Sequence, residues 1–105
     1  MKVESYILVY AVRYALGRQS GAVLDVVQAV IENIDEIEEK YKGVILKDVL
    51  SYLTEIKDSP YQWEDIVISW KSLAKALYAK LSDETKEWLV NPLGGGISPK
   101  MVNAL

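Results

Sequence analysis

The chain has 105 residues, of which half are apolar and 26% are charged, so it can fold as a single domain around one hydrophobic core. Its 12 basic and 15 acidic side chains leave a net charge of −3, which argues against binding to duplex nucleic acid. The absence of Cys and His removes disulfides, thiol nucleophiles, imidazole bases and the usual zinc ligands. We therefore expect a binding protein rather than an enzyme, with no cofactor and no bound metal.

The beginning of the chain is mostly apolar but does not have the pattern of a signal peptide. Glu4 interrupts the basic region that a signal peptide requires, Arg13 ends the apolar run, and no small-residue cleavage site follows. The run is also too short to span a bilayer. We expect a cytoplasmic protein with no membrane association.

The first two predicted helices form a hairpin. Apolar residues recur at helical spacing between residues 3 and 16, although several β-branched residues there also favour a strand. Gly17 provides a C-terminal stop, and Ser20 is a natural N-cap for the next helix. Only Gly17, Arg18 and Gln19 separate the two helices, which predicts a tight connection.

The second and third helices are predicted from amphipathic patterns. The second extends from about Gly21 to Lys40, with valines and isoleucines on one face and acids on the other. Gly43 is expected to break it, and the pattern then repeats in a third helix that ends near Asp58.

A strong helix start signal precedes the fourth predicted helix. Ser59 can cap this helix, Pro60 suits its first position and Gln62 can complete a capping box. The helix extends to about Leu81, and Trp70 lies on its wide apolar stripe. Trp70 is therefore expected to anchor the core.

The end of the chain is predicted to contain one short helix and a tail. Residues 82–90 have helix signals, whereas residues 91–105 contain three glycines and two prolines and are expected to be extended. The alternative is that the apolar end of the tail packs on its own domain or on a neighbouring subunit. The sequence predicts an all-α, single-domain bundle over residues 1–90, with four main helices and a short fifth, followed by the extended C-terminal tail.

The predicted hairpin carries positive charge in a chain that is negative as a whole. Arg13 and Arg18 are the only arginines, and no acid lies between Ser5 and Leu24. A turn that leads into a helix offers free backbone N–H groups and the positive end of the helix dipole, and Arg adds a planar donor for phosphate or carboxylate. This pattern predicts a site for an anionic, nucleotide-like ligand.

The ring surfaces of two tyrosines one helical turn apart would complete this site. The predicted ligand-binding residues are Tyr10, Arg13, Tyr14, Arg18, Gln19, Ser20 and Gly21. Gly21 would let a ligand approach the backbone closely.

A purely structural explanation of the same residues stays open. In this alternative Arg18 pairs with Asp25, Arg13 pairs with an acid such as Glu32, and both tyrosines belong to the core. The phosphate-loop motif GxxxxGK[ST] is absent, so the hairpin pattern is not specific for nucleotides.

Acidic residues cluster toward the end of the predicted second helix. Four of them have the spacing of one helical face: Glu32, Asp35, Glu36 and Glu39. This spacing fits either a metal site or a solvated face, and without a facing acidic helix we expect the solvated face.

Two aromatic residues form a second candidate surface. An exposed Trp63 beside Tyr61 would be an anchor for a protein partner. The alternative is that Trp63 and Trp88 close the core.

Residues 13–20 have the sequence RYALGRQS and are followed by Ala22-Val23 and Val26-Val27. This segment resembles the motif R-Y-A-L-G-R-x-[ST]-aromatic-x-V in small uncharacterised proteins of bacteriophages and bacterial mobile elements. Gly21 stands where the relatives more often have an aromatic residue, so a ring contact there is missing. The resemblance implies a phage or prophage setting, in which small helical proteins inhibit host defence by blocking a protein or sequestering a nucleotide signal.

A homodimer or larger assembly is also predicted. The first helix is apolar on nearly every side from Tyr6 to Val12 and needs more cover than the other helices supply. Two functions follow as hypotheses. One is binding of a phosphate- or nucleotide-like molecule at the hairpin, and the other is inhibition or bridging of a host protein through the acidic helix or the edge formed by Tyr61 and Trp63.

Overall fold

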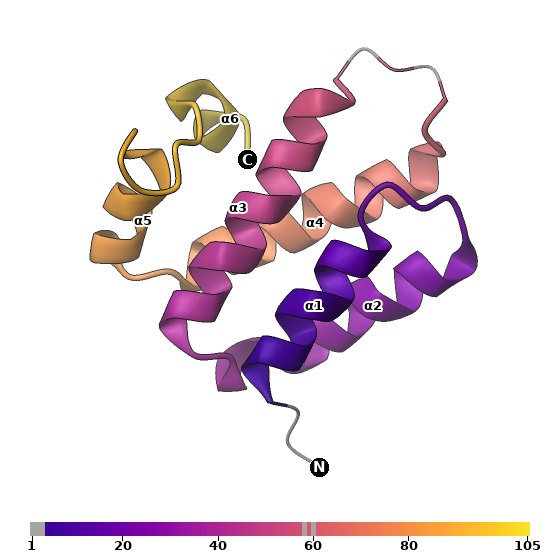
Figure 1. Cartoon of the computed structure of the whole chain (residues 1–105), viewed down its shortest axis with the longest axis horizontal. Helices are drawn as coiled ribbons and strands as arrows, with labels where there is room; N and C mark the ends of the chain where they lie inside the picture. Colours follow the sequence, from indigo (N-terminus) through magenta and orange to yellow (C-terminus); the bar gives the residue numbers. More distant parts are fainter. Residues whose placement is uncertain (1–3, 58, 60) are drawn as a thin grey trace.

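The computed structural model of the chain describes residues 4–57, 59 and 61–105. Its fold is all-α, as predicted. Over these residues it contains six α-helices and one 3-10 helix and no strand (Figure 1). In chain order they are α1 (Ser5–Ala15), α2 (Gly21–Glu32), η1 (Ile34–Glu36), α3 (Glu39–Glu55), α4 (Glu64–Lys80), α5 (Asp83–Val90) and α6 (Pro99–Asn103).

The four longer helices lie in two layers. In Figure 1, α1 and α3 run side by side in the nearer layer, with α2 and α4 behind them. Extensive contacts join α3 to α4, α2 to α4, α1 to α3 and α1 to α2. The molecule measures 37 × 35 × 19 Å, and its thickness matches two stacked helices.

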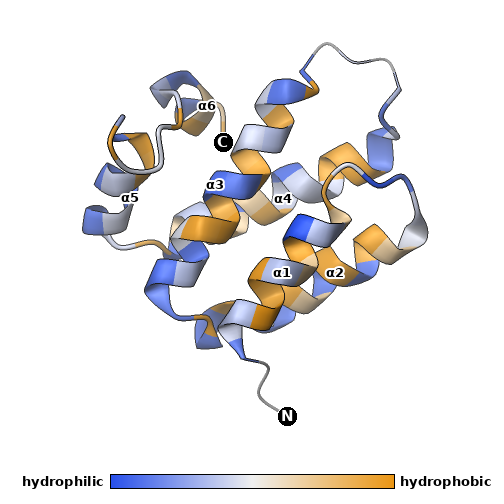
Figure 2. Cartoon of the chain, in the orientation of Figure 1, coloured by the Kyte–Doolittle hydropathy of each residue, from blue (hydrophilic) through white to orange (hydrophobic). Residues whose placement is uncertain are grey.

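The core lies between the two layers and consists of aliphatic side chains around Trp70. Trp70 is fully buried, as predicted, and Leu50 and Leu77 are among the other fully buried residues. Hydrophobic residues extend along most of α1, whereas the first turns of α5 are hydrophilic (Figure 2). Part of the surface of α1 is not covered by the core, because Tyr6, Ile7, Tyr10 and Tyr14 are exposed.

The predicted long second helix is divided in two. α2 ends at Glu32, and the side-chain Nδ2 of the C-cap residue Asn33 donates to the carbonyl of Ala29 at 2.7 Å; η1 then leads into α3 at Glu39. Ile37, in this connection, is buried in the core. The break was missed because no Gly or Pro marks it and the apolar spacing continues through it.

Gly43 does not break a helix but lies buried inside α3. A Cβ atom at this position would lie 2.9 Å from Cγ2 of Thr85 and 3.3 Å from Cζ3 of Trp88. Glycine is used here for close packing of α5 against α3. The prediction of a helix stop at Gly43 was therefore wrong.

The helix start signal before α4 was also misinterpreted. α4 begins at Glu64, and Gln62 uses its side chain to accept a hydrogen bond from the Tyr52 hydroxyl instead of completing a capping box. Ser59 Oγ accepts from the Tyr61 N–H at 3.3 Å. Pro60, and the predicted end of the third helix at Asp58, lie outside the described residues.

The predicted extended tail is wrong, because residues 91–105 fold back on the domain. The Gly95 N–H donates to the carbonyl of Trp88 at 2.8 Å, and the Ile97 N–H donates to that of Leu89 at 2.9 Å. Ile97 is buried, and Ser98 caps α6 by accepting from the Lys100 N–H. The alternative prediction, in which the apolar end packs on its own domain, fits the structure, because Met101, Val102 and Leu105 pack against the core.

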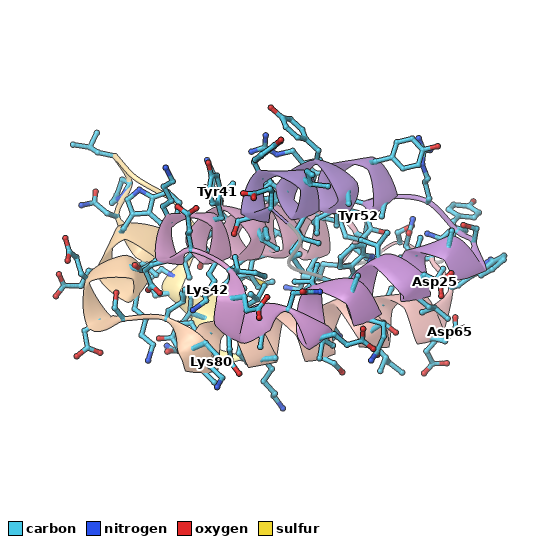
Figure 3. All side chains as sticks on the ribbon, turned by 90° about the horizontal axis from the view of Figure 1, so that it is seen from below. Asp25, Tyr41, Lys42, Tyr52, Asp65 and Lys80 are labelled. Carbon is cyan, nitrogen blue, oxygen red and sulfur yellow. The ribbon has the colours of Figure 1, made fainter. Side chains whose placement is uncertain are left out.

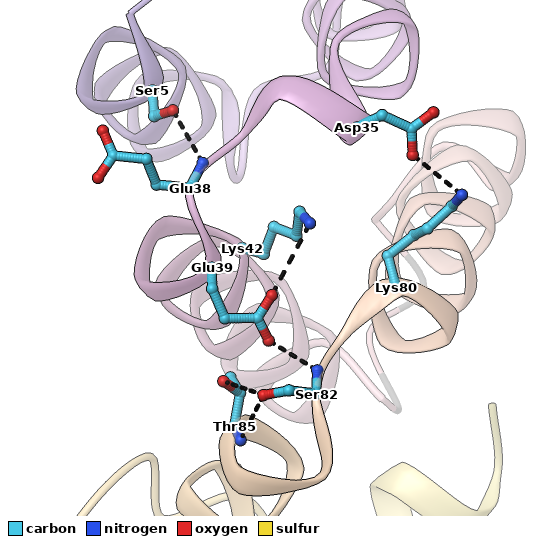
Figure 4. Close-up of polar contacts among 8 residues, drawn as sticks. All are labelled: Ser5, Asp35, Glu38, Glu39, Lys42, Lys80, Ser82 and Thr85. Carbon is cyan, nitrogen blue, oxygen red and sulfur yellow. Dashed lines mark hydrogen bonds and ion pairs between the residues drawn. The ribbon is translucent and has the colours of Figure 1, made fainter.

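Polar contacts link the segment before α3 and the first turn of α3 to the connection between α4 and α5 (Figure 4). The Glu39 carboxylate accepts from the Ser82 N–H at 2.7 Å, and this bond, more than any other contact, lowers the pKa of Glu39. Lys80 pairs with Asp35 at 2.9 Å. Within the described part of the chain, no helix has the length and apolar character needed to cross a membrane.

Candidate functional site

The α1–α2 hairpin forms as predicted. Gly17 has φ +90°, a conformation that favours glycine, and it ends α1. Ser20 occupies the N-cap position of α2 with an extended backbone, but its side chain makes no capping hydrogen bond. The position of Ser20 was predicted correctly and its capping contact was not.

Gln19 connects the hairpin to the segment before α4. Its Nε2 donates to Oε1 of Gln62 at 2.6 Å, and its Oε1 accepts from the backbone N–H of Trp63 at 2.7 Å. The Tyr52 hydroxyl donates to the same Gln62 oxygen at 2.5 Å. Both polar atoms of the Gln19 side chain are thus engaged, so a ligand would have to compete with internal hydrogen bonds.

Tyr52 is the buried member of this hydrogen-bond network. Figure 3 shows Tyr52 inside the molecule, and its burial raises the pKa of its hydroxyl. The hydroxyl therefore stays protonated and acts as a donor.

The two arginines have different partners from those considered in the sequence. Arg13 pairs with Asp48 of α3 at 2.8 Å rather than with Glu32. Arg18 forms no ion pair with Asp25, and its guanidinium carbon lies 3.9 Å from the centre of the Tyr14 ring. Arg18 is therefore held at the surface by a cation–π contact.

Tyr10 and Tyr14 are surface residues, so the alternative that placed them in the core is wrong. Their exposed fractions are 65% and 69%, and Tyr6 and Ile7, on the same side of α1, are about half exposed. The Tyr6 and Tyr10 rings make an edge-to-face contact with their centres 6.5 Å apart. Tyr6, Ile7, Tyr10 and Tyr14 are called the aromatic face below.

The second predicted surface adjoins the hairpin. Tyr61 is exposed and Trp63 is 53% exposed, while Gln19 holds the Trp63 backbone against the hairpin. The alternative that Trp63 closes the core is therefore wrong, whereas Trp88 is partly buried against it. The start of α4 lies near the α1–α2 connection in Figure 1. The structure thus brings two separately predicted sites to one end of the molecule.

The hollow beside the hairpin does not favour an anion. It has a volume of about 380 Å³, and its charged lining residues are Arg13, Asp48 and Glu55. Arg13 is neutralised by Asp48, so Glu55 leaves the hollow negative. An anionic ligand at the hairpin would instead have to bind on the outside, near Arg18 and the first turn of α2.

The acidic run does not form one helical face, because the chain leaves α2 before Asp35. Glu32 ends α2, Asp35 and Glu36 lie in η1, and Glu39 begins α3. Among the described residues, no group of three or more acids is placed to hold a metal ion.

Sequence reasoning missed three residues that organise the site: Asp48, Tyr52 and Gln62. Asp48 is the nearest acid to Arg13 in space but lies 35 residues away in sequence, and Gln62 lies 43 residues from Gln19. No local pattern marks these pairs.

Comparisons with known proteins returned no match: none of the family models, curated proteins or solved structures was found to be similar to this chain. The resemblance of residues 13–27 to phage proteins therefore stays a prediction.

Proposed function

We propose that this chain is a non-enzymatic binding protein that contacts another protein through the aromatic face of α1. The observation that carries the proposal is the exposure of Tyr6, Ile7, Tyr10 and Tyr14 side by side on one helix. Contiguous exposed apolar residues mark interaction sites, and tyrosine is enriched in them because its ring is apolar and its hydroxyl can stay hydrated. In this proposal the four longer helices are a rigid bundle that presents the face.

The first partner to test is a second copy of the chain, in a homodimer or larger assembly. The members of the aromatic face are uncharged. Arg18, whose guanidinium lies over the Tyr14 ring, is exposed and would stay hydrated at the edge of a contact between two copies. The nearby edge of Tyr61 and Trp63 would extend the contact.

Sedimentation at micromolar concentration tests this proposal. We expect the wild type to sediment as a dimer or larger species and Tyr10→Glu to sediment as a monomer, because the added carboxylate would be buried unpaired. Leu93→Glu is the matched control, since Leu93 is 98% exposed and lies outside the aromatic face. If the wild type sediments as a monomer, a second copy of the chain is not the partner.

The phage-like motif supports a setting in the host bacterial cytoplasm, where the protein would counter host defence. Expression in a bacterium that restricts phage growth is then expected to restore plaque formation. Tyr10→Glu is expected to lose this effect, and equal activity of the two proteins would show that the aromatic face is not the surface used.

Binding of a nucleotide-like anion at the hairpin is a second candidate function. It is favoured because the first turn of α2 has neither a side-chain cap nor an acid, and Arg18 is held on Tyr14 beside it. Nucleotides and inorganic phosphate are expected to raise the melting temperature by mass action. Arg18→Ala should weaken their affinity roughly ten- to a hundredfold and leave the fold intact, because the Arg18 guanidinium makes an exposed cation–π contact and no ion pair among the described residues. No shift with any of these anions would exclude this function.

A further inference from the structure

A separate apolar groove lies on the other side of α3 from the hairpin hollow. It has a volume of about 580 Å³. Its lining residues come from the end of α3 and the segment that follows it, from α4 between Glu64 and Lys75, and from the chain between Met101 and Leu105. Small-molecule sites have volumes of about 300–1,000 Å³, so the groove has the size of a small-ligand site. No residue of the aromatic face lines it.

The groove has an apolar base. Leu50 and Leu53 of α3 are buried residues in its lining, and Val67 and Ile68 of α4 lie across from them. Met101 of α6 adds a flexible side chain to the lining. Ile68 is 54% exposed, so this apolar surface is open to a ligand.

The rim of the groove is positive, in contrast to the whole chain. Lys57, Lys71 and Lys75 line it together with one acidic side chain, that of Glu64, whereas the chain has a net charge of −3. Lys71 and Lys75 are one turn apart on α4. None of the three lysines has an ion-pair partner among the residues that the structure describes.

We infer that the groove binds an amphipathic carboxylate with a single alkyl chain, of the fatty-acid type. The alkyl chain would cover Leu53, Val67 and Ile68, and the carboxylate would lie between Lys71 and Lys75. Lysine can place its methylene stem along such a chain while its ammonium group stays hydrated beside the headgroup. The charge at the rim selects the sign of the headgroup, and the volume suits a small ligand rather than a whole helix of a partner.

Calorimetric titration with dodecanoate, below its micellar concentration, tests this inference. We expect saturable one-to-one binding and a rise in melting temperature, because the ligand binds only the folded state. Dodecyltrimethylammonium has the same alkyl chain and the opposite charge, and we expect no saturable binding of it. Equal binding of the two amphiphiles would overturn the inference, since only apolar contact would then be measured.

Charge reversal at the rim locates the site. Lys71→Glu is expected to weaken dodecanoate binding roughly five- to tenfold, as for loss and reversal of an exposed ion pair. Lys40→Glu changes the net charge equally, at the opposite end of α3, and should bind like the wild type. Equal losses in the two variants would show a general charge effect and contradict the assignment.

A second pair of variants tests the apolar wall. Ile68→Glu places a carboxylate in the groove and should abolish binding, whereas Leu93→Glu makes a similar change at a fully exposed position outside it. Self-association that Lys71→Glu abolishes, without any dodecanoate binding, would make the groove a protein contact and overturn the inference. Because the aromatic face lies elsewhere, Tyr10→Glu should leave dodecanoate binding unchanged.

Discussion

At the hairpin end of the molecule, Tyr10, Tyr14 and Trp63 leave more than half of their surfaces exposed, whereas at the α5 end Trp88 packs against glycines. Both ends contain large aromatic residues, but a Cβ atom at Gly43 or Gly94 would meet Trp88, whereas a Cβ atom at Gly17 or Gly21 in the hairpin would meet nothing within 4 Å. A ring contributes to folding stability when neighbouring atoms close around it, and it remains available for a partner when they do not. Substitutions at the two ends of the molecule are therefore expected to have different effects on folding stability.

The largest expected effect distinguishes a core ring from a surface ring. Trp70→Ala should lower the free energy of unfolding by about 3–5 kcal/mol, because it empties a fully buried site. Tyr10→Ala should change it by less than about 0.5 kcal/mol. Urea denaturation measures both, and a large loss for Tyr10→Ala would mean that the aromatic face is structural.

Trp70→Phe sharpens the same test. The Nε1 atom of Trp70 is buried and has no hydrogen-bond partner among the described residues, so it stabilises nothing that phenylalanine would lose. We expect a clearly smaller loss for Trp70→Phe than for Trp70→Ala in the same denaturation experiment. Equal losses would contradict the expectation that packing of the ring, which phenylalanine partly retains, accounts for the stability.

Glycine substitution compares the two ends directly. A Cβ atom at Gly95 would lie 2.5 Å from the carbonyl oxygen of Leu89, so Gly95→Ala should destabilise the fold by about 1–3 kcal/mol. At Gly21 a Cβ atom would meet nothing within 4 Å, and Gly21→Ala should stabilise by about 0.4–1 kcal/mol. Thermal denaturation of both variants measures the difference, and a neutral Gly95→Ala would contradict the tight packing at the α5 end.

Removal of Gln19 tests what holds the hairpin end together. Gln19→Ala loses the hydrogen bonds to Gln62 and to the Trp63 N–H, which should cost about 1–2 kcal/mol of unfolding free energy. It should also accelerate hydrogen exchange at the Trp63 amide. Gln28→Ala is the control, because it removes one exposed contact to Glu32 within α2 and should cost less than about 0.5 kcal/mol. Unchanged exchange at Trp63 would mean that Gln19 does not hold this segment.

The smallest expected effect concerns pH at the α5 end. The Ser82 N–H lowers the pKa of Glu39 below its ordinary value of 4.5. The stability from this contact is therefore present above about pH 4.5 and is lost as the pH falls through the lower pKa of the folded state. Glu39→Gln should lose less than about 1 kcal/mol at pH 7, because the carboxylate is partly exposed, and its deficit should shrink toward pH 3. Glu38→Gln is the control, because it removes the same charge without the Ser82 contact. A stability deficit of Glu39→Gln that does not depend on pH would argue against this assignment.

The prediction of the fold succeeded where local chemistry was sufficient. The stop at Gly17, the buried Trp70 and the short helix predicted over residues 82–90 each depend on a residue type and its near neighbours. It failed at Gly43, because a glycine that permits close packing and a glycine that ends a helix are the same residue in sequence. It also failed for the tail, where glycines that indicate flexibility serve instead to let the chain pack on Trp88 and Leu89.

The sequence by itself determined the residues that make the hairpin and the helical character of the chain, because capping, turn chemistry and apolar periodicity act over a few residues. Only the tertiary structure decided which of those residues remain exposed and what they contact. Tyr10 and Tyr14 carry the same helical pattern as core residues, and their exposure follows from how many helices surround α1. The Gln19 contacts with Gln62 and Trp63 span 43 and 44 residues, and a contact between such distant residues exists only after the layers have packed.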